Sequence, residues 1–224
     1  MYYHIHYLRI VILTCLVCFP SSFVFFASAV EMKKASIARK NAVITCVVYG
    51  VLAGIVYGMG NLCHVSFYVS GWIILGGVAG LAVIFIELGM AQLKAKKEFG
   101  SFTKIIKPPK TYVEKFNAWN LLFIVLAACF EELLFRQILI RELYFGLPLG
   151  FLVLAVLISA FLYAINHIYF SVFAVAQKFV SALVFAALFV FSGYNLLIPM
   201  VAHCVQNTAL YLYGTYSYRK DAKK

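Results

Sequence analysis

Charged residues are scarce in this chain of 224 residues, and the acidic ones, 8 in number, are fewer than the 19 basic ones. Only 12% of the residues are charged and 64% are hydrophobic, whereas soluble domains are about half apolar and about a quarter charged. This composition excludes a soluble globular domain, and every polar stretch is too short to form a separate one. We therefore expect an integral membrane protein built from packed transmembrane helices.

Several residue patterns that define other proteases are absent. The chain contains a single aspartate, Asp221, near its carboxyl terminus, which excludes a pair of intramembrane catalytic aspartates. It has no HExxH zinc-protease motif and no GxSG serine motif. Its six cysteines all lie within or beside apolar segments, so we interpret them as small membrane residues rather than as a disulfide framework.

Seven apolar stretches approach or exceed the roughly 20 residues that a helix needs to cross a bilayer. They cover residues 8–30, 42–60, 66–90, 118–140, 147–168, 172–193 and 195–214. The sequence thus predicts an all-α, polytopic transmembrane helix bundle of about seven spans, or of six if residues 1–31 are not part of the mature protein. Those residues are a span, a signal cleaved after the A-x-A pattern that ends at Ala29, or a misassigned start before Met32.

Lysine and arginine gather in three segments, at 31–41, at 92–117 and in the carboxyl-terminal tail. With seven spans all three segments fall on one side of the membrane, and the positive-inside rule makes that side the cytoplasm. The net charge of +11 therefore indicates topology and not nucleic-acid binding. We expect a multi-pass protein with a cytoplasmic carboxyl terminus and with the lipid bilayer as a partner.

Small residues at intervals of four predict places where two helix backbones approach closely. They are Gly50, Gly54 and Gly58 in one span and Gly76 and Gly80 in the next. We interpret them as contacts within a single bundle.

A few ionisable side chains lie inside the predicted spans, where a charge costs roughly 3 kcal/mol by insertion scales and usually has a function. Glu132 and Arg136 are four residues apart, so they share a helix face and can pair. Glu131 is rotated from Glu132 by about 100° and has no cation on its own helix. Glu87 and Lys178 lie near span ends, and we interpret both as reaching the membrane interface.

Two later spans carry histidines that can join Glu131. His203 and Asn207 are four residues apart and share a face, and His167 ends an earlier span. We expect these side chains to surround one buried polar cavity. A carboxylate and an imidazole can deprotonate a water, and a second imidazole with an amide can stabilise an oxyanion. Glu131, His167 and His203 could instead bind zinc, and the residues alone leave both alternatives open.

These residues resemble the CAAX-protease and bacteriocin-processing family of intramembrane proteases, also called the Abi family, and in particular its type II CAAX prenyl endopeptidases. The family motifs EExxxR, FxxxH and HxxxN correspond to residues 131–136, 163–167 and 203–207. Tyr163 stands where the second motif has phenylalanine. The resemblance covers roughly residues 118–214.

The resemblance implies an intramembrane endopeptidase of the glutamate type, which requires no cofactor; a zinc metalloprotease is the alternative. The catalytic residues would be Glu131, His167, His203 and Asn207, and the supporting residues would be Glu132 and Arg136. Of the four catalytic residues, the first two would activate water and the last two would form the oxyanion site.

The resemblance also bears on organisation and substrate. It assigns the catalytic helical core to 118–214, while hydropathy and charge predict transmembrane helices with a basic cytoplasmic loop at 1–117 and a basic cytoplasmic tail at 215–224. The implied substrate is a peptide or a membrane protein, either prenylated or a bacteriocin precursor, cleaved at a bacterial plasma membrane. A non-catalytic bacteriocin immunity or scaffold protein with the same fold is the main alternative. A small proton-coupled transporter is a further alternative, although no inverted repeat supports it.

Overall fold

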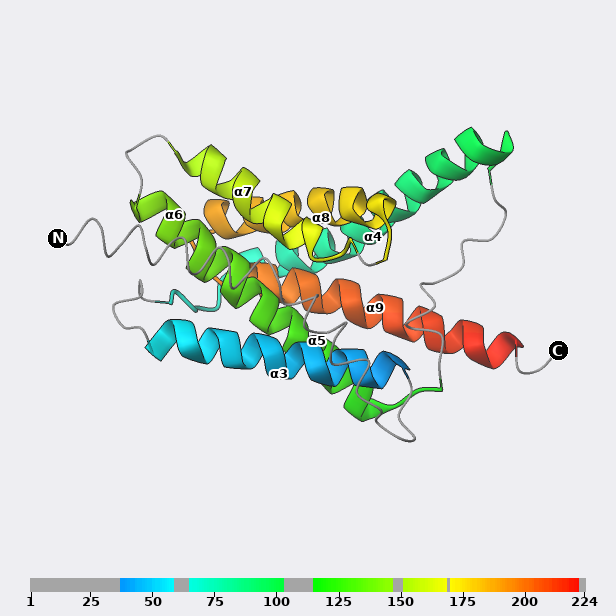
Figure 1. Cartoon of the computed structure of the whole chain (residues 1–224), viewed down its shortest axis with the longest axis horizontal. Coiled ribbons are helices and arrows are strands. Elements are labelled where there is room, and N and C mark those ends of the chain that lie inside the picture. Colours follow the sequence, from blue (N-terminus) through cyan, green and yellow to red (C-terminus); the bar gives the residue numbers. More distant parts are fainter. Residues whose placement is uncertain (1–36, 59–64, 103–114, 147–150, 169, 222–224) are drawn as a thin grey trace.

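The computed structural model describes residues 37–58, 65–102, 115–146, 151–168 and 170–221, which form a bundle of helices (Figure 1). The elements are α3 (Ile37–Gly58), α4 (Trp72–Phe99), α5 (Ala118–Glu132), the π-helix η2 (Leu133–Ile140), α6 (Arg141–Gly146), α7 (Leu152–Ile165), α8 (Val172–Phe191) and α9 (Leu197–Asp221). Within these residues the only β-type pairing is an isolated bridge between Ser66 and Asn195. The all-α prediction is therefore confirmed for this part of the chain, and the predicted span at 8–30 lies outside it.

Among the described residues, three helical stretches are long and apolar enough to cross a membrane: Trp72–Phe99, Ala118–Ile140 and Val172–Phe191. Shorter apolar stretches occupy Val43–Ile55 and Leu152–Ile165. The protein is thus an integral membrane protein. The number of seven spans stays a prediction.

The segment before α4 is extended, although we predicted that a span would begin at residue 66. The side chain of Asn195, which lies between α8 and α9, holds this segment. Its Oδ1 accepts a hydrogen bond from the Tyr68 amide at 3.4 Å, and its Nδ2 donates to the Tyr68 carbonyl at 2.7 Å. The Tyr68 hydroxyl donates to the Ser192 carbonyl at 2.9 Å. These bonds satisfy the backbone as helical bonds would, so α4 begins only at Trp72.

Three helices extend further than hydropathy predicted. The helix α4 continues through lysines that we assigned to the basic loop, and it ends where Gly100 adopts a φ of 71°, which favours glycine. The helix α6 prolongs η2 across residues 141–146, which lie between the predicted spans 118–140 and 147–168. The helix α9 continues to Asp221 and so includes most of the predicted basic tail. Helical hydrogen bonds join backbone atoms, so a helix does not have to end where its side chains become polar.

The helix α9 packs against α4, α5 and α8 and lies in the middle of the bundle (Figure 1). The predicted close approach of α4 is confirmed, because a Cβ at Gly76 would lie 2.9 Å from the Ile198 carbonyl oxygen and one at Gly80 would collide with the Ala202 carbonyl oxygen. A Cβ at Gly50 would lie 3.5 Å from the Phe130 ring. The backbone of α4 therefore touches α9 directly before His203.

Candidate active site

The helix that carries the EExxxR motif begins at a capping residue and changes its type of helical turn within the motif. The side chain of Asn117 caps it by accepting hydrogen bonds from the amides of Trp119 at 2.9 Å and Asn120 at 3.4 Å. After Glu132 the α-helix changes into the π-helix η2, which contains Arg136. Wide turns of this kind are rare and occur frequently at functional sites. The sequence analysis did not predict this change.

Glu132 forms two charged contacts in the centre of the bundle. Its Oε2 lies 3.1 Å from Nε of Arg136, and both side chains are 0% exposed. This is the predicted pair, and it is confirmed as a charge contact. The N–H groups of Arg136 are not aligned on the carboxylate as hydrogen bonds. The other oxygen, Oε1, accepts a hydrogen bond from Nδ1 of His203 at 2.8 Å, a partner that helical spacing could not reveal.

His203 lies between the two adjacent glutamates. This histidine is buried on α9. Its Nδ1 contacts Glu132, and its Nε2 lies 3.6 Å from Oε2 of Glu131. Both glutamates of the motif thus reach one imidazole, although they point in different directions from α5. A carboxylate only accepts hydrogen bonds, so the Glu132 contact places a proton on Nδ1. Of the six predicted site residues, the structure therefore brings together Glu131, Glu132 and His203. Arg136 joins them because it contacts Glu132.

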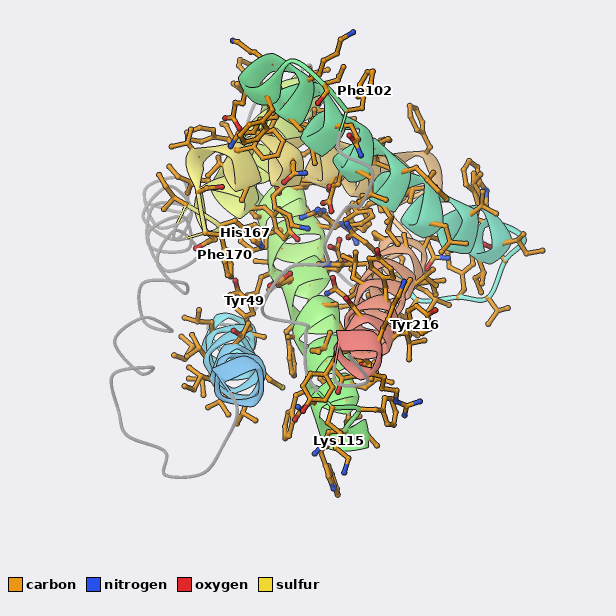
Figure 2. All side chains as sticks on the ribbon, turned by 90° about the vertical axis from the view of Figure 1, so that its right-hand side faces the viewer. Tyr49, Phe102, Lys115, His167, Phe170 and Tyr216 are labelled. Carbon is orange, nitrogen blue, oxygen red and sulfur yellow. The ribbon has the colours of Figure 1, made fainter. Side chains whose placement is uncertain are left out.

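His167 and Asn207 lie nearby with fewer contacts. Nδ1 of His167 donates to the Tyr163 carbonyl at 3.1 Å, which leaves Nε2 as the proton acceptor of the neutral ring. His167 and Tyr49 of α3 lie on the same side of α5 (Figure 2). Asn207 is half-buried on α9. Within the described residues, no hydrogen bond links either side chain to Glu131, so their convergence on one cavity stays a prediction.

Tyr163 connects these groups, although its sequence position showed only a departure from the family motif. Its hydroxyl lies 3.4 Å from Nε2 of His203, and its ring packs against the His167 ring with centroids 5.0 Å apart. The Arg136 guanidinium lies 5.0 Å from the centre of the Tyr163 ring, in a cation–π contact. Phe185 stacks on His203 from α8, at 5.1 Å. Aromatic rings thus enclose the charged groups and separate them from lipid.

The interpretation of Glu87 and Lys178 as interfacial side chains is wrong. The two side chains pair at 2.8 Å between α4 and α8, and they are only 12% and 20% exposed. The same Glu87 oxygen also accepts hydrogen bonds from Ser181 at 2.8 Å and from Gln206 at 3.0 Å. Two charges inside a membrane protein are stable when they satisfy each other, and partners on different helices leave no local sequence pattern.

Two thiols form a second contact between α5 and α9. The sulfurs of Cys129 and Cys204 are 3.6 Å apart, and both cysteines are free. Cys129 precedes Glu132 by one helical turn, and Cys204 follows His203 directly. The thiol contact and the Glu132–His203 hydrogen bond are therefore neighbouring links between the same two helices.

Mild oxidation with hydrogen peroxide should join Cys129 and Cys204, because their sulfurs need to move closer by about 1.5 Å to reach a disulfide length of about 2.05 Å. Two thiols would become one disulfide, and peroxide would be reduced to two waters. Peptide mapping by mass spectrometry without reductant would detect the linked peptides. Absence of a Cys129–Cys204 linkage would contradict the packing of α5 on α9.

The described residues show no ready-made set of metal ligands: no three His, Cys, Asp or Glu side chains in this part of the chain are grouped to hold a metal ion. Nδ1 of His203 is bound to Glu132, and Nδ1 of His167 is bound to a carbonyl of its own helix. Metal-binding histidines usually make the same kind of contact through their second ring nitrogen. The choice between the glutamate and the zinc alternative therefore stays a prediction, and we derive no step through a metal.

The region that contains the three motifs matches a known family. Residues 114–209 match the family model of type II CAAX prenyl endopeptidase Rce1-like proteins. This part of the chain is similar to the CAAX protease family. The predicted resemblance is thereby confirmed. Comparison with curated proteins gives no match, and comparison with solved structures gives none either.

The CAAX protease region begins just before α5 and ends within α9. It includes the Glu132–Arg136–His203 cluster and the carboxylate of Glu131. The helices α3 and α4 lie outside the match, yet both pack against helices inside it. The family implies protease activity within a membrane, on a peptide substrate.

Proposed function

We propose that this protein is an intramembrane endopeptidase in which Glu131, together with His167, activates a water molecule. The observation that carries the proposal is the position of His203, whose two ring nitrogens face the two adjacent glutamates at 2.8 Å and 3.6 Å. Glu132 is already engaged by Arg136 and by His203. Arg136 pairs with Glu132 and not with Glu131, so the Glu131 carboxylate is the one available as general base.

The proposed reaction begins with transfer of a water proton to Glu131. The water oxygen then attacks the carbonyl carbon of the scissile peptide bond, and the carbonyl oxygen becomes an oxyanion. His203 and Asn207 donate hydrogen bonds to this oxyanion. The proton on Glu131 passes to the amide nitrogen, the C–N bond breaks, and the two peptide products leave. His167 assists the first proton transfer through its Nε2 atom.

The proposed oxyanion role requires a protonated His203. With Nδ1–H bound to Glu132, Nε2 can donate to an oxyanion only when the ring is an imidazolium. Two carboxylates, one guanidinium and one imidazolium then sum to zero charge. A balanced set of charges is less costly inside a bilayer than one carrying a net negative charge. The Glu132–Arg136 pair therefore supports His203 by holding both its orientation and its charge.

Substrate and topology follow from the same proposal. The substrate is a peptide or a membrane protein, and a prenylated protein and a bacteriocin precursor are the two classes to compare. We place the basic end of α9 in the cytoplasm, by the positive-inside rule, and the protein in a bacterial plasma membrane. A non-catalytic immunity protein with the same fold would retain the helices without cleaving either substrate.

Purified protein in detergent should cleave a membrane peptide from one of these two classes, and His167→Gln should lower kcat by about a hundredfold, within the range for one acid–base group. Mass spectrometry of the products would measure the rate and locate the cleaved bond. Addition of a zinc chelator should leave the wild-type rate unchanged. Cleavage of neither class by wild type would favour the non-catalytic alternative, and loss of activity with the chelator would contradict the glutamate mechanism.

A further inference from the structure

Glu87 is the centre of a buried polar cluster that lies outside the matched family region but reaches into it. One carboxylate oxygen accepts from Lys178 and Ser181 on α8 and from Gln206 on α9, at 2.8, 2.8 and 3.0 Å. The backbone carbonyl of Glu87 accepts from the Gln177 side chain at 2.7 Å. One residue of α4 thus holds two helices of the CAAX protease region at the same level of the bundle.

The bond to Gln206 reaches the part of α9 that carries the active site. Gln206 is fully buried, follows His203 by three residues and directly precedes Asn207. One turn earlier on α9, the carbonyl of Ala202 lies against Gly80 of α4. Ala202 directly precedes His203. The helix α4 therefore contacts α9 immediately before each of the two residues proposed to stabilise the oxyanion. Glu132 holds α9 from the α5 side, so α9 is held on two faces.

We propose that Glu87 is a positioning residue of the active site, which sets the rotation of α9 through Gln206 and thereby the places of His203 and Asn207. Lys178 neutralises Glu87 so that the carboxylate is stable at this depth. The consequence for catalysis rests on the proposed function, whereas the consequence for the position of α9 does not. A displacement of catalytic groups by about 1 Å can reduce a rate by as much as a hundredfold, so a small rotation of α9 is enough to matter.

Gln206→Met removes the link to α9 at similar side-chain length, and Ser181→Ala removes a bond to the same Glu87 oxygen without touching α9. Gln206→Met should lower kcat about tenfold with KM unchanged, while Ser181→Ala should stay within about twofold of wild type. The double variant Glu87→Met/Lys178→Met removes the charged pair without leaving a single buried charge, and it should behave like Gln206→Met. Thermal unfolding in detergent shows whether each variant remains folded.

The rate of oxidative linkage between Cys129 and Cys204 provides a second measurement that needs no enzymatic activity. Both thiols lie at the α5–α9 contact, so a rotation of α9 changes the distance between them. Gln206→Met should change this rate at least twofold, and Ser181→Ala should not. A linkage rate in Gln206→Met equal to that of Ser181→Ala overturns the proposal, whatever the activity. A changed linkage rate in a protein whose wild type is inactive upholds the positioning role and refutes the proposed function.

Discussion

Glu131→Gln should lower kcat for peptide cleavage by about a thousandfold, because the variant removes the proposed general base and keeps the shape of its side chain. Glutamine cannot accept the water proton, and its side chain has the same length, so it can occupy the same place beside Nε2 of His203. Substrate binding should change little, so KM should stay near the wild-type value. Initial rates in detergent, with product identified by mass spectrometry, would measure both constants.

The matched control is Glu98→Gln, which changes the same type of side chain on the exposed end of α4. Its side chain is 50% exposed and pairs with Lys94 at 3.7 Å. This variant should retain the wild-type rate. Glu132→Gln offers a second comparison, since Glu132 is proposed to orient His203 and not to take the proton. Full activity of Glu131→Gln would assign the base to another residue, and an inactive Glu98→Gln would indicate a defect unrelated to the site.

Arg136→Met should destabilise the protein by about 3–5 kcal/mol, because it leaves the buried Glu132 carboxylate without its guanidinium. Glu132 and Arg136 are both 0% exposed, so solvent cannot replace the lost partner. The variant also removes the cation–π contacts of Arg136 with Tyr163 and Phe185. Chemical denaturation in detergent, followed by tryptophan fluorescence, would measure the loss of stability.

The double variant Glu132→Gln/Arg136→Met separates stability from activity. It removes both charges and so leaves no single buried charge without a partner, which is the costly feature of Arg136→Met, so much of the lost stability should return. Activity should not return, since the orientation and charge of His203 depend on Glu132. Lys94→Met is the control for the ion pair itself, because Lys94 and Glu98 have the same spacing on an exposed helix face. Lys94→Met should lower the free energy of unfolding by no more than about 0.5 kcal/mol. An equal loss of stability in Lys94→Met and Arg136→Met would contradict the proposal that burial makes the Glu132–Arg136 pair important for stability.

The hydrophobic runs predicted the helices of the CAAX protease region closely. The stretch predicted at 118–140 is the stretch Ala118–Ile140 of the structure, and the capping residue Asn117 marks its first turn. Boundaries were less accurate where polar residues border the membrane, as in α4, α6 and α9. Hydropathy reports where a helix lies in lipid, while the backbone bonds that end a helix depend on local turns and on neighbouring segments such as the one bound to Asn195.

In the candidate site, the contacts within one helix could be predicted and the contacts between helices could not. Spacing along one helix was sufficient to pair Glu132 with Arg136 and to separate Glu131 from them. No pattern in the sequence showed that Glu132 binds His203, that the Tyr163 hydroxyl reaches the same imidazole, or that η2 is a π-helix. Glu87 and Lys178 are 91 residues apart, and their positions near span ends led to the wrong interpretation.

The sequence by itself determined that this is a helical membrane protein, which helix faces carry charge, and which family its second half resembles. These properties depend on composition and on residues within one or two turns of each other, where helix geometry leaves little freedom. Only the tertiary structure decided which charged faces meet. The rotation and height of α4, α5, α8 and α9 relative to one another follow from the packing of many side chains at once, including the glycines that let α4 touch α9. That packing brings His203 to both glutamates, and Glu87 to the helix on which His203 lies.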